Sequence, residues 1–208
     1  KTFGGLRYID SQAPSVTYMI HKIITAMGDV PIEEEAETLL FGLCTDTGFF
    51  RHLESKSAPV FESAAELVKA GASPKRVHSA IYGGKPLASR TLLGILLART
   101  EAYYNGRVLV TYETLSEKEK YGEKSRDSDT LYRHLQEVEG CEAVLLVREE
   151  SPGECSVGLR SNKHIDVGKI AYAFGGGGHS KAAGFMSNSS IEQTIEGVLK
   201  SLGSHYDW

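Results

Sequence analysis

The spacing of apolar residues changes once along the chain, near Val108, and this change constrains the fold more than any other feature. Before Val108, apolar residues recur every three or four positions, which is the period of helices that bury one face. After it, short runs rich in Val, Leu and Ala alternate with helical stretches, an order typical of a sheet with connecting helices. We therefore predict an α/β protein in which a helical N-terminal part precedes a smaller α/β unit with a mixed sheet.

Helix-start residues and glycine stops set the bounds of the expected elements. Pro14 and Gly28 flank the first helix, and Pro31 starts a second helix whose first turn holds three glutamates. The apolar faces expected to be buried are Val16, Met19, Ile20, Ile23, Ile24 and Met27 in the first helix, and Ile32, Ala36, Leu39, Leu40 and Leu43 in the second. The other expected helices are 57–70, 74–82, 87–99, 129–139, 166–174 and 191–202, and the expected strands are 107–113, 142–149, 155–161 and 182–186. These elements divide the chain into residues 1–85, a linker helix within 86–104, and a separate α/β unit at 105–208.

Composition argues against several classes of protein. The 208 residues carry a net charge of −4, which disfavours a protein that coats nucleic acid without regard to sequence. The hydrophobic content of 41% is enough for a core, and no apolar run approaches the ~18 residues of a membrane span. Cys44, Cys141 and Cys155 are odd in number and form no CxxC pair, so neither a disulfide framework nor a zinc knuckle is indicated. We interpret the chain as a globular cytoplasmic protein without membrane contact.

Four consecutive glycines precede a histidine in AFGGGGHSKAAGF, residues 173–185. Gly175 is the expected C-terminal cap of the preceding helix. Gly176, Gly177 and Gly178 are not needed for a cap, and they would allow main-chain N–H groups to surround a phosphate, while His179 adds a side-chain donor that can carry charge. A flexible hinge is the alternative interpretation. The histidine and the small residues that close the loop favour a site.

A second candidate lies in CSVGLRSN, residues 155–162. The period of two expected for a strand places Arg160 at the strand's end with Ser161 beside it. A guanidinium and a hydroxyl suit phosphate binding, although a strand-end arginine that is merely solvated is the alternative. Arg160 gains weight because only one short expected helix separates it from the glycine run.

A third candidate is Asp46 in LCTDTGFFRH. Asp46 falls at the C-terminal end of the second expected helix, where the helix dipole disfavours a carboxylate by about 0.3–1 kcal/mol. A nearby cation would relieve this conflict, and a turn aspartate is the alternative. A catalytic metal needs more than one carboxylate, and no convincing second ligand is found. The histidines of this region are each better explained as core or surface residues: His21, His52 and His78.

Two stretches resemble motifs of the DHH phosphoesterase superfamily. GGGGHSKAAGF, with GLRSNKHIDVGKIA before it, resembles the substrate-binding C-terminal domain, and LLFGLCTDTGFFRH resembles the last metal-binding motif of the catalytic domain. Their order is similar to that of small bacterial oligoribonucleases that also act as 3′-phosphoadenosine-5′-phosphate phosphatases. The resemblance implies a hydrolase with two Mn²⁺ ions that acts on short oligoribonucleotides or on this nucleotide, with a homodimer as one possible state. It implies Asp46 as a catalytic metal ligand, and as phosphate ligands Arg160, Ser161, Gly176, Gly177, Gly178 and His179.

The first residues shape what is expected of this chain. KTFGGLRYIDSQAPS resembles the stretch that follows the Asp-His-His motif of the superfamily, so the remaining metal ligands are expected upstream of Lys1. In an intact enzyme, two metal ions would bridge the scissile phosphate and lower the pKa of a bound water. We therefore expect a fragment that binds nucleotide without hydrolysing it. The alternatives are a nucleotide-binding module with no hydrolytic role, a cyclic-dinucleotide phosphodiesterase and an exopolyphosphatase.

Overall fold

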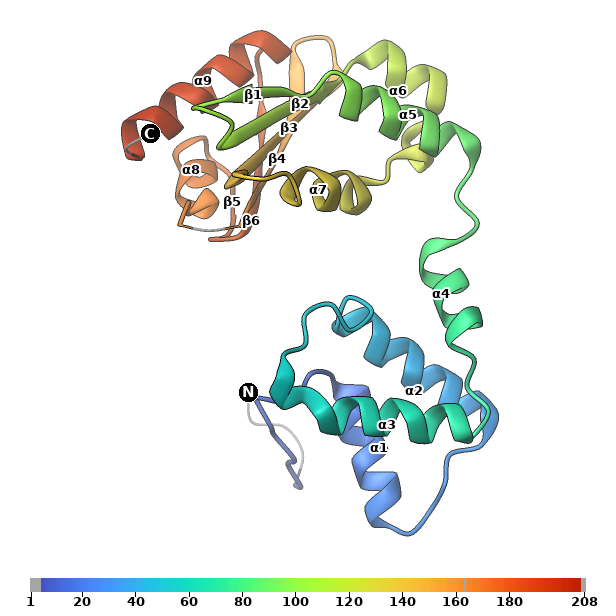
Figure 1. Cartoon of the computed structure of the whole chain (residues 1–208). Helices are drawn as coiled ribbons and strands as arrows, with labels where there is room; N and C mark the ends of the chain where they lie inside the picture. The colour runs from blue at the N-terminus through green and yellow to red at the C-terminus, as the bar shows by residue number, and fades with distance from the viewer. Residues whose placement is uncertain (1–4, 163, 207–208) are drawn as a thin grey trace. The chain divides into compact units, whose positions relative to one another are not determined.

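The computed structural model describes residues 5–162 and 164–206. The chain divides into two compact units, Lys1–Gly84 and Lys85–Trp208. The first is helical, and the second combines a sheet with helices (Figure 1). The predicted α/β class, with helices first and a mixed sheet after them, is confirmed.

The helices of the first unit follow the predicted bounds closely. Ser15 begins α1, because its Oγ accepts a hydrogen bond from the Tyr18 N–H at 3.0 Å, and Ser73 caps α4 in the same way. A short 3₁₀ turn, η1 (Ser55–Ser57), precedes α3. The α-helices are α1 (Val16–Ala26), α2 (Glu33–Asp46), α3 (Ala58–Lys69) and α4 (Pro74–Tyr82).

The core of the first unit forms around α2. Its predicted face is confirmed at Ala36, Leu39, Leu40 and Leu43, all buried. The prediction is wrong for Ile32, which is 63% exposed because it is the residue before the first turn and its side chain has left the helical stripe. Other buried side chains of this core come from α3, α4 and the loop between them: Leu67, Ala72 and Val77.

The predicted face of α1 is largely wrong. Four of its six residues are exposed, by 43% to 72% of their surface: Val16, Ile20, Ile23 and Met27. The one buried residue of α1 is His21, so the helix presents a different side to α2 and α3 than its apolar stripe. Apolar periodicity predicts the helix correctly, but it predicts the buried face of the helix only when another element packs against that face.

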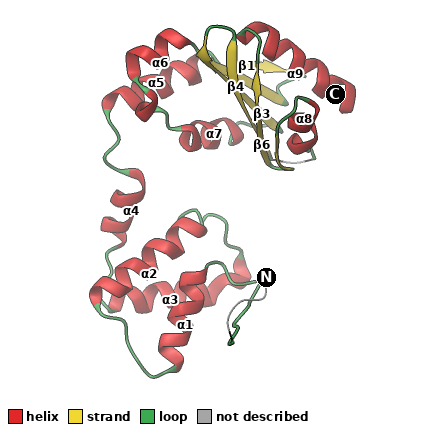
Figure 2. Cartoon of the chain, turned by 180° about the vertical axis from the view of Figure 1, so that it is seen from behind, coloured by secondary structure: helices red, strands yellow, loops and turns green. Residues whose placement is uncertain are grey.

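The strands of the second unit, yellow in Figure 2, form one sheet. Within the described residues this sheet has six strands, in the order β1-β2-β3-β4-β6-β5. β2 and β3 are parallel and every other neighbouring pair is antiparallel, which makes the sheet mixed. All four predicted strands are confirmed, and two short edge strands join them. The strands are β1 (Glu101–Tyr103), β2 (Val108–Glu113), β3 (Ala143–Ser151), β4 (Glu154–Ser161), β5 (Gly177–His179) and β6 (Ala182–Ser187).

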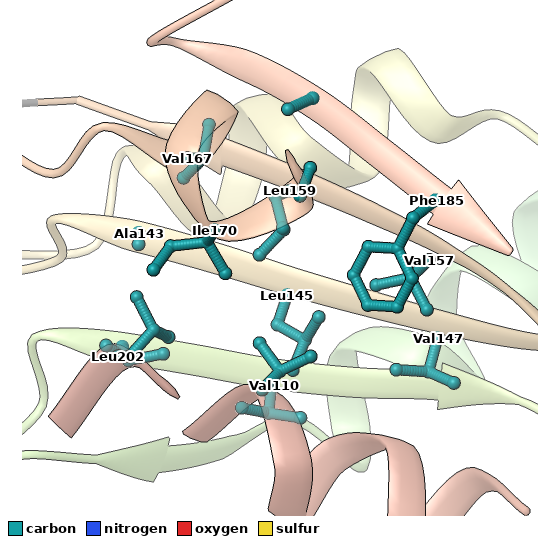
Figure 3. Close-up of a cluster of buried hydrophobic side chains, with 14 of the residues drawn as sticks. Val110, Ala143, Leu145, Val147, Val157, Leu159, Val167, Ile170, Phe185 and Leu202 are labelled. Atoms are coloured by element: carbon teal, nitrogen blue, oxygen red, sulfur yellow. The ribbon is translucent and has the colours of Figure 1, made fainter. Parts of the chain in front are cut away.

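Helices cover both faces of this sheet and create two cores. On one face, α5 (Leu87–Ala98) and α7 (Ser128–Gln136) pack their leucines on Leu109, Val144 and Leu146. On the other face, α8 (Val167–Ala173) and α9 (Ile191–His205) cover the larger core, which Figure 3 shows between Leu202, Leu145 and Phe185. Two further short segments lie between β2 and α7: the α-helix α6 (Leu115–Tyr121) and the 3₁₀ helix η2 (Glu123–Ser125). Alternating residues of the central strands therefore serve different cores.

The stretch 86–104, expected as a linker helix, packs with the second unit. Leu92 and Leu96 of α5 are buried in the core with Leu109, and the chain turns into β1 directly after the helix. Tyr104 and Asn105 have positive φ, which produces the tight β1–β2 turn before Gly106. The apolar run of α5 is thus explained by its position on the sheet.

A buried carboxylate with two arginines closes one end of the α5 face. Glu113, fully buried at the end of β2, accepts hydrogen bonds from Nε of Arg126 at 2.9 and 3.0 Å and from Nε of Arg148 at 2.9 Å. Arg126 also reaches Glu150, which accepts from Lys118 and Ser156. Burial opposes ionisation of Glu150, but the hydrogen bonds from Lys118 and Ser156 and the Arg126 charge hold its pKa at about 2. The charges of this network are paired, although one buried Nη of Arg126 has no hydrogen-bond partner among the described residues, and we assign the network to stability.

Candidate functional site

The glycine run forms the edge strand of the sheet. The side chain of Asp166 caps α8 by accepting from the Lys169 N–H at 3.2 Å, and Gly175, at φ +78°, follows the end of that helix as predicted. The chain then pairs antiparallel to β6 through Gly177, Gly178 and His179. The run is therefore an ordered part of the sheet and does not form a tether between elements.

Two of the glycines are required by close packing. A Cβ at Gly176 would collide with the Gly184 carbonyl oxygen and with Phe185. A Cβ at Gly178 would lie 2.5 Å from the Ala182 carbonyl oxygen, and the φ of +141° at Gly178 disfavours any side chain. At Gly177, by contrast, nothing lies within 4 Å of the position of a Cβ. Close approach of β5 to β6 explains Gly176 and Gly178, whereas Gly177, like Gly175 at the end of α8, has no atom within 4 Å of the position of a Cβ.

The sheet register places Arg160 and His179 in one row. Arg160 pairs with Ala182, and Ala182 pairs with His179, so all three side chains point to the same face. That face is the α7 side, because Arg160 also pairs with Val144, whose side chain belongs to that core. Two strand spacings separate Arg160 from His179, roughly 10 Å, and the small Ala182 lies between them.

The next row on the same face consists of glycines. Gly158 pairs with Gly184, and Gly184 pairs with Gly177. Beyond β4 this face is open, since Gly177, His179 and Met186 are exposed while Ala182 and Gly184 are half-buried. The result is an exposed stretch of main chain with the Arg160 guanidinium on one side and the His179 imidazole on the other.

The Arg160 side chain is held from two directions. Its guanidinium carbon lies 4.4 Å from the centre of the Tyr132 ring, and its Nη1 donates to the Leu159 carbonyl oxygen at 3.0 Å. Burial raises the pKa of the Tyr132 phenol, which keeps the ring neutral. Among the described residues, no carboxylate forms an ion pair with Arg160, whereas Arg76, Arg90, Arg99, Arg126 and Arg148 all have such partners. Arg160 therefore has N–H donors available for an anion.

Ser161 lies on the opposite face from Arg160. It pairs with Ala143, whose side chain is in the α8–α9 core, and it is 4% exposed. Its Oγ has no hydrogen-bond partner within the described residues. Gly178 also faces that side, so the register brings Arg160, Gly177 and His179 together and separates them from Ser161 and Gly178.

On the α8 side of the sheet, His179 borders a hollow. It has a volume of about 650 Å³ and is lined by residues that include Asp166, Lys169, Tyr172, His179 and His205. Figure 1 shows α8 beside β5 at this edge of the sheet. Lys169 and His205 provide positive or titratable groups there, but Asp166 adds a carboxylate that opposes binding of an anion. We therefore place the candidate site on the Arg160 side and use Lys169 as a control.

Asp46, the predicted metal ligand, is the last residue of α2 and is exposed. His78 packs edge-on against Phe49, with ring centres 5.3 Å apart, and burial lowers the pKa of His21, which lies 3.7 Å from Glu66. In residues 5–162 and 164–206, no three His, Cys, Asp or Glu side chains come together as ligands of one metal ion. A two-Mn²⁺ centre therefore does not fit the described residues alone.

The sequence analysis finds no apolar run long enough to span a membrane. In the part of the chain that the structure describes, every helix is too short or too polar to span a bilayer.

Comparison with known proteins adds one domain family, one relative and two solved structures. Residues 105–204, which contain Arg160 and His179, match the DHHA1 domain. The bifunctional oligoribonuclease and PAP phosphatase NrnA of Thermus thermophilus is 30% identical over 201 residues, which cover 96% of this chain and 60% of that protein. An exopolyphosphatase-related protein from Bacteroides fragilis superposes with a TM-score of 0.79 at 21% identity, over 93% of this chain and 57% of that one. The pGpG-specific phosphodiesterase PggH from Vibrio cholerae gives a TM-score of 0.56 at 14% identity, over 92% and 72% of the two chains. The two solved structures show a shared fold.

Proposed function

The chain belongs to the DHH/DHHA1 family of phosphoesterases, and we propose that its C-terminal unit binds a phosphate group of a nucleotide or short oligoribonucleotide on the open face of the sheet. The observation that carries this proposal is the row of Arg160, Ala182 and His179, in which two groups able to bind an anion flank a small residue. A phosphate between them would accept hydrogen bonds from the guanidinium and from the imidazole. The open surface at Gly177, in the neighbouring row, leaves space for the sugar or base of the same nucleotide.

The substrate class is proposed from chemistry and from one relative. NrnA, named as an oligoribonuclease and PAP phosphatase, matches nearly the whole of this chain, although the chain spans about 60% of its length. We propose 3′-phosphoadenosine-5′-phosphate, abbreviated pAp, and short oligoribonucleotides as the ligands. A terminal phosphate held by Arg160 and His179 would fix the end of the strand, and this would favour removal of one nucleotide at a time.

Hydrolysis requires more than the described residues. When bound, two Mn²⁺ ions would supply charge neutralisation and an activated water, and we propose Asp46 as one of their carboxylate ligands. Neither at Asp46 nor elsewhere in the described residues do three His, Cys, Asp or Glu side chains come together as ligands of one metal ion. We assign to this chain the binding and orientation of the substrate.

Titration calorimetry of the 208-residue chain tests the proposal. We expect pAp to bind and adenosine, which has the same base and sugar without phosphate, to bind at least ten-fold more weakly. With Mn²⁺ added, we expect no release of phosphate from pAp, no shortening of a tri-ribonucleotide and no cleavage of pGpG. Equal affinity for pAp and adenosine would contradict a phosphate site, and Mn²⁺-dependent turnover would show that the metal ligands lie within this chain.

A pH titration tests the role of His179. If the imidazolium donates to the phosphate, the protonated form of His179 binds more tightly than the neutral form, so the affinity for pAp should fall as the pH rises. The His179→Ala variant should bind more weakly at pH 6 and should lose this part of the pH dependence. Because the second ionisation of phosphate also falls near pH 6, sulfate, which keeps its charge throughout this range, serves as a control anion. A pH profile for sulfate that is the same in both proteins would remove His179 from the site.

A further inference from the structure

We propose that Tyr132 is a positioning residue of the phosphate site, which holds the Arg160 guanidinium in place for an incoming anion. The proposal rests on the function proposed above, and it adds a residue outside the motifs that indicated the site. Tyr132 lies on α7, in a segment of the sequence with no glycine or phosphate-binding signature.

The position of Tyr132 is fixed on three sides. It is 4% exposed and packs in the α5–α7 core with Leu131 and Leu135. Its ring lies under the Arg160 guanidinium at 4.4 Å, within the range of a cation–π contact. Its hydroxyl fills the space where a side chain at residue 158 would begin, so glycine at that position is what allows the tyrosine to reach the sheet.

Arginine needs such support at this site. An arginine side chain has several rotatable bonds. In the row of β4, β6 and β5, the residue next to Arg160 is the small Ala182, which gives the guanidinium no lateral support. No carboxylate in the described residues fixes its direction, so the ring and the Leu159 carbonyl oxygen are the two contacts that do. Fixing the guanidinium before binding removes an entropic loss that the ligand would otherwise have to offset. A neutral ring positions the guanidinium without competing with the anion, whereas a carboxylate would compete with the anion for the same N–H donors.

The rival explanation is that Tyr132 only fills the core. That role predicts that any substitution which leaves the fold intact also leaves pAp affinity unchanged. Leu135 provides the matched control, because it is equally buried at 4%, lies one helical turn from Tyr132 in the same core and has no aromatic ring to form a cation–π contact.

The experiment measures pAp affinity by calorimetry for Tyr132→Leu, Tyr132→Phe and Leu135→Ala, with thermal unfolding of each. We expect Tyr132→Leu to weaken binding about five- to twenty-fold, because the cation–π contact is lost. Tyr132→Phe, which keeps the ring, should restore affinity to within about two-fold, and Leu135→Ala should bind normally despite a lower Tm. Adding Tyr132→Leu to Arg160→Ala should cause no further loss, since both changes act through one guanidinium.

A second readout is independent of ligand binding. In the free protein, the ring should shift the Arg160 Hδ and Hε resonances upfield in wild type, in Tyr132→Phe and in the control Leu135→Ala, but not in Tyr132→Leu. Loss of this shift in Tyr132→Leu supports the contact even if pAp does not bind, in which case the proposed function fails and the positioning does not. The inference is overturned if the wild-type resonances are unshifted, or if Tyr132→Leu is folded and binds pAp as tightly as wild type while Arg160→Ala does not.

Discussion

Replacing Glu113 with Ala is expected to destabilise the C-terminal unit by about 3–5 kcal/mol, because it leaves two arginines at a buried site without their shared carboxylate. Glu113 has no exposed surface, and the side chains of Arg126 and Arg148 are only 17% and 14% exposed. Arg126 keeps its contact with Glu150, but Arg148 loses its carboxylate and keeps only the Ser128 hydroxyl. One Nη of Arg126 already lacks a partner, so the arginine has little capacity to compensate.

Hydrogen exchange of the central β3 amides measures this effect, since their opening reports the stability of the sheet. Leu145 and Leu146 are suitable probes because both are fully buried. Glu113→Gln, which preserves volume, should lose less stability than Glu113→Ala. Glu123→Gln is the control, because Glu123 contacts Lys118 with 64% of its own side chain exposed and should change little. A loss below about 1 kcal/mol in Glu113→Ala would contradict the assigned role.

Replacing Arg160 with Ala is expected to weaken pAp binding about ten- to a hundred-fold, which corresponds to the loss of one charge-assisted contact of about 1.5–3 kcal/mol. The fold should tolerate this change, since the Arg160 side chain lies on the surface of the sheet over Tyr132. The effect should shrink at high salt, as expected for a partly exposed ion pair. Calorimetry at two ionic strengths measures both expectations.

Lys169→Ala is the matched control for Arg160. The Lys169→Ala substitution also removes one positive charge close to His179, but Lys169 lines the hollow on the α8 side. We expect less than a two-fold change in pAp affinity for this variant. If Lys169→Ala weakens binding as much as Arg160→Ala, long-range charge explains both results, and if only Lys169→Ala weakens it, the site lies on the α8 side.

Much of the fold could be predicted from local signals. The Pro and Gly signals around α2 to α4, and the alternation of β2 to β4, act within a few residues, so they specify elements without knowledge of the partner. The exposed face of α1 could not be predicted in this way. Ile20 and Ile23 have the spacing of a buried stripe, but burial depends on which surface lies opposite, and the sequence of one helix does not contain that information.

The sequence motifs name residues of the candidate site, but they do not give the arrangement of these residues in the sheet. The glycine run was interpreted as a phosphate cradle, yet Gly176 and Gly178 are explained by the close approach of β5 and β6. That Arg160 and His179 share a row follows from the pairing of β4, β6 and β5, which no local pattern encodes. Tyr132 was missed entirely, because its contact with Arg160 joins α7 to β4. The glycine at 158 is a signal of that contact only once the two elements are known to pack.

The measurement that tests the central claim most directly is an NMR titration of the isotope-labelled chain with pAp, with the amide and arginine side-chain signals assigned. The account predicts that the largest shifts occur at the Arg160 Nε–H and at the amides of Gly177, His179 and Ala182, which border one open face of the sheet. Adenosine at the same concentration should leave the Arg160 signal unchanged. Shifts confined to Lys169, Tyr172 and His205, or an Arg160 signal that does not move at saturating pAp, would contradict a phosphate site on this face.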